Sequence, residues 1–350
     1  VELTAAGLPA NTGYGNLTTT GSTRGNYNPR IATNGCTASW VMVTAEAFAN
    51  LYTQLVATPD AVPLGSCVGG GGGGGGGVAP ISTGSPIDFS GDGKADLIWR
   101  NLDTGLNVVW NMDGATLTGA SYLPTVPDTT WQIAGVTDAT ADGEADIFWR
   151  NTRSGDNALW YMNNLDITGG ASLPSVVNTD WEIVGNADFN ADGSKDLLWR
   201  HATLGLNALW YMNGTAISNA AMLPTVTDPD WQVVGAGDFN GDKKPDVVWR
   251  YAPAAGTAGA YTCPVCIAGL NVVWFMDGPN LSSYAFLPSV TDTAWRAVAL
   301  VDLDGDGYLD VIWRNSTTGA NAVWYLEGTT LKSSASLPSV PSQRWVIARY

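Results

Sequence analysis

The sequence predicts an all-β fold, a five-bladed β-propeller of four-stranded blades, over residues 88–350. A pattern of about 50 residues occurs five times in this region, and repeats of this length with four strands each are typical of propeller blades. Of the 16 Trp residues in the chain, 15 fall at three positions of the pattern. Such regular placement indicates an architectural role for Trp.

The five copies open at Asp88, Asp138, Asp188, Asp238 and Asp302. Each copy begins with an approximate Asp-x-x-x-Asp-Gly-x-x-Asp motif that leads into Trp-Arg, and it continues with Gly-x-Asn, a second Trp, Leu-Pro and a third Trp. The first three intervals are 50 residues long and the fourth is 64. We therefore expect one insertion in the fourth copy, at roughly residues 252–269.

Four short segments in each copy favour strands. In the first copy they are residues 96–100, 107–110, 121–123 and 131–134, which are rich in β-branched and aromatic residues and are separated by turn residues. A pair of residues suited to positive φ joins the second and third segments. In chain order these pairs are Asp113-Gly114, Asn163-Asn164, Asn213-Gly214, Asp277-Gly278 and Glu327-Gly328.

The two ends of the repeat region predict how the ring closes. Trp345–Tyr350 matches the segment led by Trp131, whereas residues 81–87, before the first copy, contain no Trp. We expect the C-terminal strand to complete the first blade, because this pairing would also remove an open sheet edge.

Residues 1–67 are predicted to form a small N-terminal module with one helix, roughly residues 44–57. Residues 68–87 read as a linker, since nine glycines at 69–77 precede a Pro/Ser/Thr-bearing stretch. The four cysteines suggest two disulfides, Cys36 with Cys67 in the module and Cys263 with Cys266 in the insertion. A zinc or redox site is less favoured for the second pair, which has neither a second ligand pair nor a βαβ context.

The opening loop of each copy has the oxygen donors of a calcium site. Asp occupies relative positions 1, 5 and 9 and an oxygen-bearing residue occupies position 3, and Ca²⁺ takes six to eight oxygen ligands. Position 6 is Gly except in the fourth copy, where Lys243 stands, so the Asp238 loop should be the weakest of about five sites. The alternative is an Asx-turn loop whose carboxylates are satisfied by its own backbone amides. The expected ligands are Asp88, Ser90, Asp92, Asp96, Asp138, Thr140, Asp142, Asp146, Asp188, Asn190, Asp192, Asp196, Asp238, Asn240, Asp242, Asp246, Asp302, Asp304, Asp306 and Asp310.

These loops are not EF-hands, because position 12 is Trp99 or its equivalent in place of a bidentate Glu. The repeat resembles the FG-GAP and VCBS repeat families over residues 88–350, with weaker similarity to propeller lectins. The FG-GAP and VCBS resemblance implies calcium bound between strands of the blades and a secreted or cell-surface location.

The charge and composition of the chain argue against several classes of function. The chain carries 16 Lys and Arg against 32 Asp and Glu, so we expect no nucleic-acid partner. His201 is the single His, which argues against hydrolases and metal sites that depend on His. The sequence has no run of 18 apolar residues, so we expect no membrane span. The acidic triplet recurs in every copy, whereas catalysis usually needs one asymmetric set of groups, and we expect no enzyme activity.

Trp, Arg and Asn recur together in a way that suits sugar binding, because Trp faces stack on pyranose rings while guanidinium and amide groups bond hydroxyls. The alternative is that Trp fills the space between blades while Arg bonds neighbouring Asp or backbone carbonyls. The candidate ligand-binding residues are Trp99, Arg100, Asn107, Trp149, Arg150, Asn157, Trp199, Arg200, Asn207, Trp249, Arg250, Asn271, Trp313, Arg314 and Asn321.

Together these observations predict a non-catalytic, extracellular interaction domain that is carbohydrate-binding or adhesive and has calcium-stabilised loops. Its expected partner is a glycan or a surface protein. The alternative is a structural subunit of a surface assembly or filament, in which the N-terminal module forms homo-oligomers and the propeller is displayed.

Overall fold

The computed structural model describes residues 31–33, 36–38, 87–253 and 268–350. Near the N-terminus, β1 (Ile31–Thr33) pairs antiparallel with β2 (Cys36–Ala38). The expected helix at 44–57, nearly all of the linker and both expected disulfides lie outside the described residues or their side chains. The domain boundaries at 67 and 87 therefore stay predictions.

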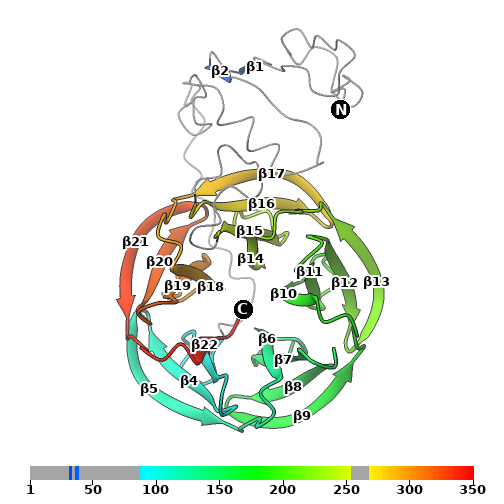
Figure 1. Cartoon of the computed structure of the whole chain (residues 1–350), viewed down its shortest axis with the longest axis vertical. Helices are drawn as coiled ribbons and strands as arrows, with labels where there is room; N and C mark the ends of the chain where they lie inside the picture. The colour runs from blue at the N-terminus through cyan, green and yellow to red at the C-terminus, as the bar shows by residue number, and fades with distance from the viewer. Residues whose placement is uncertain (1–30, 34–35, 39–86, 254–267) are drawn as a thin grey trace. The chain divides into compact units, whose positions relative to one another are not determined.

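The second part of the chain is a propeller of five four-stranded antiparallel sheets arranged around a central axis (Figure 1). The predicted fold class is confirmed for this part. Blade 1 contains β22 (Trp345–Ile347), β3 (Leu97–Asn101), β4 (Asn107–Asp113) and β5 (Thr116–Leu123), from the axis outward. Blade 2 contains β6 (Trp131–Thr137), β7 (Asp146–Asn151), β8 (Asn157–Asn163) and β9 (Asp166–Leu173).

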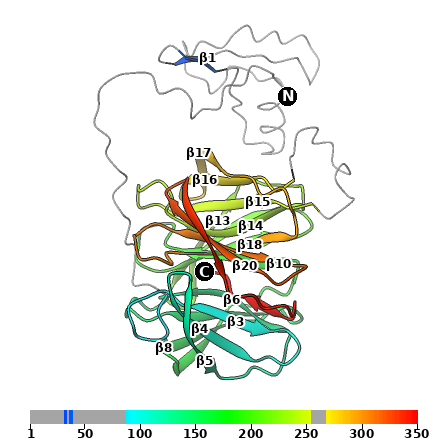
Figure 2. The same cartoon turned by 90° about the vertical axis from the view of Figure 1, so that its left-hand side faces the viewer.

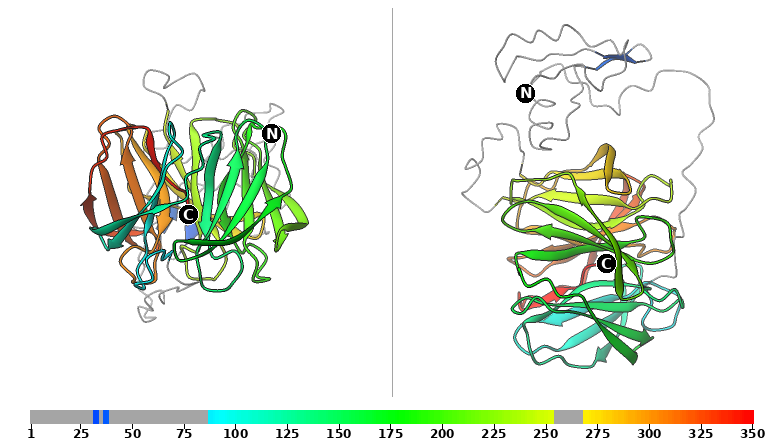
Figure 3. Two further views of the ribbon diagram at one scale, coloured as in Figure 1. Left: turned by 90° about the horizontal axis from the view of Figure 1, so that it is seen from below. Right: turned by 90° about the vertical axis from the view of Figure 1, so that its right-hand side faces the viewer.

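Blades 3, 4 and 5 repeat this order. Blade 3 contains β10 (Trp181–Ala187), β11 (Asp196–His201), β12 (Asn207–Asn213) and β13 (Ala216–Leu223). Blade 4 contains β14 (Trp231–Gly237), β15 (Asp246–Tyr251), β16 (Asn271–Asp277) and β17 (Asn280–Leu287). Blade 5 contains β18 (Trp295–Val301), β19 (Asp310–Asn315), β20 (Asn321–Glu327) and β21 (Thr330–Leu337). Seen edge-on, the strands of each blade run between the two faces of the propeller (Figures 2 and 3).

The C-terminal strand closes the ring as the sequence predicts. In β22, Trp345 pairs with Asn101 and Ile347 with Trp99 of β3. The Tyr350 hydroxyl continues the contact, because it accepts a hydrogen bond from the Ile98 amide (2.6 Å) and donates one to the Asp96 carbonyl (3.1 Å). Blade 1 is thus built from strands at both ends of the propeller sequence.

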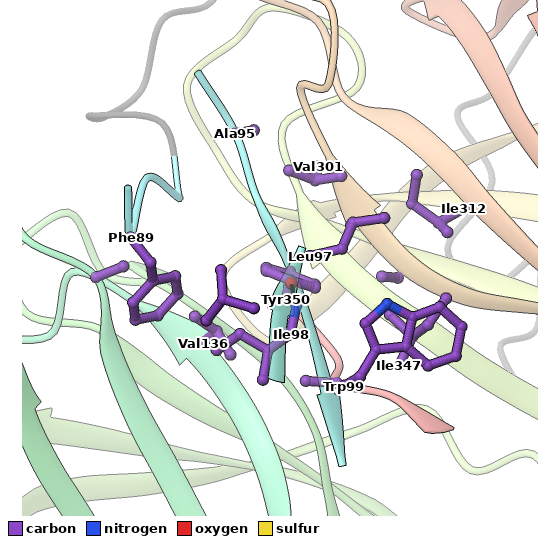
Figure 4. Packing of buried hydrophobic residues seen from close by; sticks show 14 of the residues in the cluster. Phe89, Ala95, Leu97, Ile98, Trp99, Val136, Val301, Ile312, Ile347 and Tyr350 are labelled. Carbon is purple, nitrogen blue, oxygen red and sulfur yellow. Dashed lines mark hydrogen bonds between the residues drawn. The ribbon is translucent and has the colours of Figure 1, made fainter. Parts of the chain in front are cut away.

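Burial changes from the axis outward. The second strand of each blade is buried on both sides, with all six residues buried in β7, β11, β15 and β19. The outer strands are largely exposed and bury fully only their last residue, as Leu123 does in β5. Figure 4 shows this core around β3, where Leu97, Ile98 and Trp99 lie near Ile347 and Tyr350. Long uncharged runs such as Val-Ile-Trp in β19 suit strands that are covered on both faces.

Candidate functional site

The five acidic loops lie at one face of the propeller. Each loop joins the inner strand of a blade, or in blade 1 the segment that leads into β3, to the second strand. In blades 2 to 5, the position-9 Asp is the first residue of the second strand. Since the inner strands of a propeller are equivalent, the loops repeat around the axis at the same strand end.

The position-9 carboxylates anchor the loops. Asp96 is fully buried, its Oδ2 accepts hydrogen bonds from the Phe89 and Ser90 amides (both 2.9 Å), and its Oδ1 accepts one from the Met112 amide in β4 (3.0 Å). One side chain therefore ties the loop to two strands of the blade. The equivalent buried residues are Asp146, Asp196, Asp246 and Asp310.

Burial makes these carboxylates costly to ionise. It raises the pKa of Asp196 to about 6, of Asp246 to about 7 and of Asp310 to about 8, although backbone hydrogen bonds partly offset the rise. In the fifth loop, the charges of Asp302 and Asp304 add to the rise at Asp310. A bound cation would favour the ionised forms and offset this cost.

The position-1 carboxylates accept hydrogen bonds from the amides of their own loops. Asp88 accepts one from the Gly91 amide (2.7 Å) and one from the Gly93 amide (2.6 Å). Asp302 does the same with the amides of Gly305 (2.8 Å) and Gly307 (2.9 Å). This is the Asx-type arrangement that the sequence leaves open as an alternative to metal binding.

The position-5 carboxylates also accept hydrogen bonds from backbone amides of their own loops. The Asp92 Oδ1 accepts the amide hydrogen of Lys94 at 2.9 Å, and the same bond two residues along the chain recurs at Asp142, Asp192, Asp242 and Asp306. Among the described residues, the one group of three acidic side chains with ligand atoms within 4.8 Å of one another is Asp302, Asp304 and Asp310. The fifth loop thus brings together positions 1, 3 and 9 of the four positions expected as ligands.

Position 6 of the fourth loop keeps the shape that Gly gives the others. Lys243 has φ +66°, in the left-handed region, and its amide donates to Asp238 Oδ2 at 2.6 Å. The geometry of the loop is therefore preserved, at the steric cost of a Cβ in this region.

The Trp, Arg and Asn residues proposed for sugar binding are packed inside the propeller. The five Trp are 1–2% exposed, the five Arg 1–6% and the five Asn 0–2%. In blade 1, the Arg100 guanidinium donates to the Gly105 carbonyl (3.1 Å), Asn107 Oδ1 (2.9 Å) and the Val126 carbonyl (3.1 Å). Asn107 Nδ2 in turn donates to the Pro124 carbonyl at 2.8 Å.

Each of these Arg side chains also lies over the Trp of the next blade. The distance from Cζ to the Trp centroid is 5.0 Å for Arg100 on Trp149 and for Arg314 on Trp99, and it is 4.8–4.9 Å at the other three interfaces. These contacts form a closed circle of five. They match the packing alternative, and a sugar would reach these residues only if the blades separated.

Comparison with known proteins agrees with the repeat structure. The FG-GAP-like repeat family matches residues 88–149 and 188–249, and the FG-GAP repeat family matches residues 294–326. This chain carries FG-GAP-like repeats. Propellers built from such repeats are typical of adhesion or interaction domains and are usually non-catalytic.

Several solved structures are similar at low identity. A chain of a nidogen/laminin complex is 12% identical, with 73% of this chain and 96% of that chain covered and a TM-score of 0.41. A protein of unknown function from Bacteroides caccae is 12% identical (69% and 72% covered, TM-score 0.37). A putative 6-phosphogluconolactonase from Bacteroides uniformis is 13% identical (72% and 70% covered, TM-score 0.36). Similarities this weak carry no argument about function. The comparison with curated proteins found no match to the chain.

Proposed function

We propose that the propeller is a non-catalytic, extracellular interaction domain that binds carbohydrate or mediates adhesion, with calcium stabilising its acidic loops. The observation that carries this proposal is the repetition of one loop at the same end of five blades, on a closed and rigid scaffold. Loops on a rigid scaffold are a common location for binding residues.

Calcium binding is supported by the donors that each loop offers. The fifth loop has the best set, because Asp302, Asp304 and Asp310 bring three carboxylate oxygens together, and hard cations prefer such oxygens. We propose about five sites, one for each loop, of which the Asp238 loop is the weakest because of the Lys243 charge and backbone. The ions would lower the repulsion among carboxylates and so stabilise the fold.

The environment of His201 supports a non-catalytic role. This side chain is 3% exposed, its Nε2 lies 3.2 Å from Asn178 Nδ2, and its ring packs edge-on against Trp181. These contacts are those of a packing residue at the start of a turn. Among the described residues, no helix is long and apolar enough to cross a membrane.

A glycan array tests the proposed function directly. The full chain, loaded with calcium, should bind one or a few related glycans, and binding should be weaker in EDTA. A folded, calcium-loaded chain that is silent on the array and on adhesion to cells would contradict carbohydrate binding and adhesion. The alternative role as a structural subunit predicts instead that the chain assembles, and that residues 78–350 alone do not. Size-exclusion chromatography of both forms tests this.

A further inference from the structure

A cavity of about 530 Å³ opens on the loop face of the propeller. We call it the vestibule, and its wall includes the ends of four inner strands and Tyr350, which follows β22. These are Val136 and Thr137, Asn186 and Ala187, Ala236 and Gly237, Leu300 and Val301, and Tyr350. Its volume lies within the range of small-molecule binding sites.

The axial channel is crossed beneath the vestibule. Arg349 of blade 1 donates a hydrogen bond from Nη1 to the carbonyl of Ile183 in β10 at 3.3 Å. Blades 1 and 3 are not neighbours in the ring, so this side chain spans the axis. Ile183 lies three residues before Asn186 in the same strand, on the side away from the loops. Arg349 therefore crosses the axis on the side of the vestibule away from the loops, and a ligand would enter from the loop face.

One polar side chain breaks the symmetry of the vestibule. Each inner strand opens with a Trp, and the fifth residue after that Trp lines the vestibule. This residue is Tyr350 in blade 1, Val136 in blade 2, Asn186 in blade 3, Ala236 in blade 4 and Leu300 in blade 5. Asn186 is 5% exposed, and its buried Nδ2 has no hydrogen-bond partner in the described part of the chain. Buried amides are nearly always bonded, and an unpaired one needs an explanation. Val, Ala or Leu, which other blades carry at this position, would avoid the free-energy cost of burying an unpaired amide.

The neighbouring blade accommodates this amide. A Cβ on Gly135 would lie 2.3 Å from Asn186 Nδ2, so Gly at 135 leaves the space that the amide occupies. Thr137, two residues further along β6, is 9% exposed and also lines the vestibule. Blades 2 and 3 thus form a polar wall with hydroxyl and amide groups.

Blades 4 and 5 add apolar side chains to the lining, beside Asp238, Asp302 and Asp304. Leu300 and Leu309 of blade 5 line the vestibule, and a Cβ on Gly237 would lie 2.2 Å from Leu309 Cδ1, which shows that this side chain extends over β14. Ala236 lies beside these leucines in the lining. A ligand with a polar edge and an apolar face could therefore contact the amide and hydroxyl on one side and these apolar groups on the other.

We propose that the vestibule binds a single sugar ring, the terminal residue of a glycan. The hydroxyl edge would lie against Thr137 and Asn186, and the C–H face against Leu300 and Leu309. Sugar hydroxyls both donate and accept, so they can serve either atom of the amide. This inference rests on the proposed carbohydrate-binding function and gives it a location, since the recurring Trp-Arg-Asn residues are buried between blades.

Saturation-transfer NMR and calorimetry on the full calcium-loaded chain test the vestibule. The probes are methyl glycosides of glucose, galactose, mannose, fucose and N-acetylglucosamine. Asn186→Leu introduces the residue that blade 5 carries at this position, so we expect it to fold with an unchanged or higher melting temperature. Its affinity for the sugar that binds should fall at least about tenfold, the effect of roughly one lost hydrogen bond. Thr137→Val, a substitution of similar shape, should also weaken binding. Asn219→Ala, on the exposed outer strand β13, is the matched control and should bind normally.

The outcomes separate this inference from the function on which it rests. Binding by the wild type and the control, with loss in Asn186→Leu and Thr137→Val, supports the vestibule. Normal binding by both variants overturns the vestibule while it leaves carbohydrate binding intact. A wild type that binds none of the glycosides and no glycan on the array overturns both. Binding of a simple amine such as butylamine in the vestibule, in place of sugars, would also overturn the proposal.

Discussion

The Arg314→Lys substitution tests whether the circle of Arg side chains holds the ring closed. The Arg314 guanidinium packs over Trp99 and so connects the last blade to the first. It donates to the Gly319 carbonyl (3.3 Å), Asn321 Oδ1 (3.0 Å) and the carbonyls of Val340 and Ser342 (both 2.9 Å). Lysine keeps the charge but lacks the planar fork of donors that reaches these four acceptors.

The magnitude follows from the number of bonds lost. A lysine ammonium can replace about one of the four bonds, so about three are lost. At roughly 1 kcal/mol net for each bond, the free energy of unfolding should fall by about 3 kcal/mol. The side chain is only 5% exposed, so water does not readily replace the missing donors.

Urea unfolding, followed by Trp fluorescence at neutral pH, measures this loss as a lower midpoint. Arg344→Lys is the matched control, because the Arg344 side chain is 65% exposed and pairs with Asp103 at the surface. Its effect should be about 0.5 kcal/mol or less. A loss below about 1 kcal/mol in Arg314→Lys would refute the idea that the guanidinium network holds the blades together.

Three further predictions concern the loops and turns. Gly319→Ala should lower the free energy of unfolding by about 3 kcal/mol or more, because φ is +74° and a Cβ would lie 2.0 Å from the Val340 carbonyl oxygen; an unchanged urea midpoint would count against this packing. Lys243→Gly should raise the free energy of unfolding by about 1 kcal/mol, since Lys243 has φ +66°, where a Cβ is strained. A decrease would contradict backbone strain at this position. In EDTA, the melting temperature should fall as pH rises from 5 to 9. Burial raises the folded-state pKa of Asp246 to about 7 and of Asp310 to about 8. The stability that these protonated side chains contribute at low pH is therefore lost as the pH rises through these folded-state pKa values. A melting temperature that rises over this range in EDTA would contradict the assignment.

The propeller itself follows from the sequence because the repeat spacing is nearly constant. Four β-prone segments per copy give four strands per blade. A terminal Trp-led segment with no partner at the other end gives the closure by β22, which pairs with β3 as expected. Local sequence and topology point to the same structure here, so the fold could be predicted before any coordinates.

The environment of the Trp-Arg pairs could not be predicted in the same way. Alternation along a strand assigns half of the residues to an exposed face only where one face of the sheet meets solvent. The second strand of a blade is covered on both faces, and in β19 both Trp313 and Arg314 are buried. The sequence contained the correct residues, but their surroundings depend on the neighbouring blade.

The loops and the vestibule show two other limits. Spacing predicts that the oxygens at positions 1, 3, 5 and 9 converge. In the fifth loop, the atoms of positions 1, 3 and 9 lie within 4.8 Å of one another, while the position-5 carboxylate accepts a hydrogen bond from the backbone amide at position 7. Asn186 was missed altogether, although aligning the five copies shows one Asn among Val136, Ala236, Leu300 and Tyr350. A single polar residue at an otherwise apolar repeat position is a signal that the sequence alone could have provided.

The melting temperature of the full chain in calcium and in EDTA, together with analysis of bound metal, tests the central claim most directly. We predict a clear rise in melting temperature with calcium and about five bound ions in each chain, since the acidic loop occurs five times. An unchanged melting temperature together with no bound metal would show that backbone amides alone satisfy the loop carboxylates, and it would contradict calcium stabilisation of this propeller.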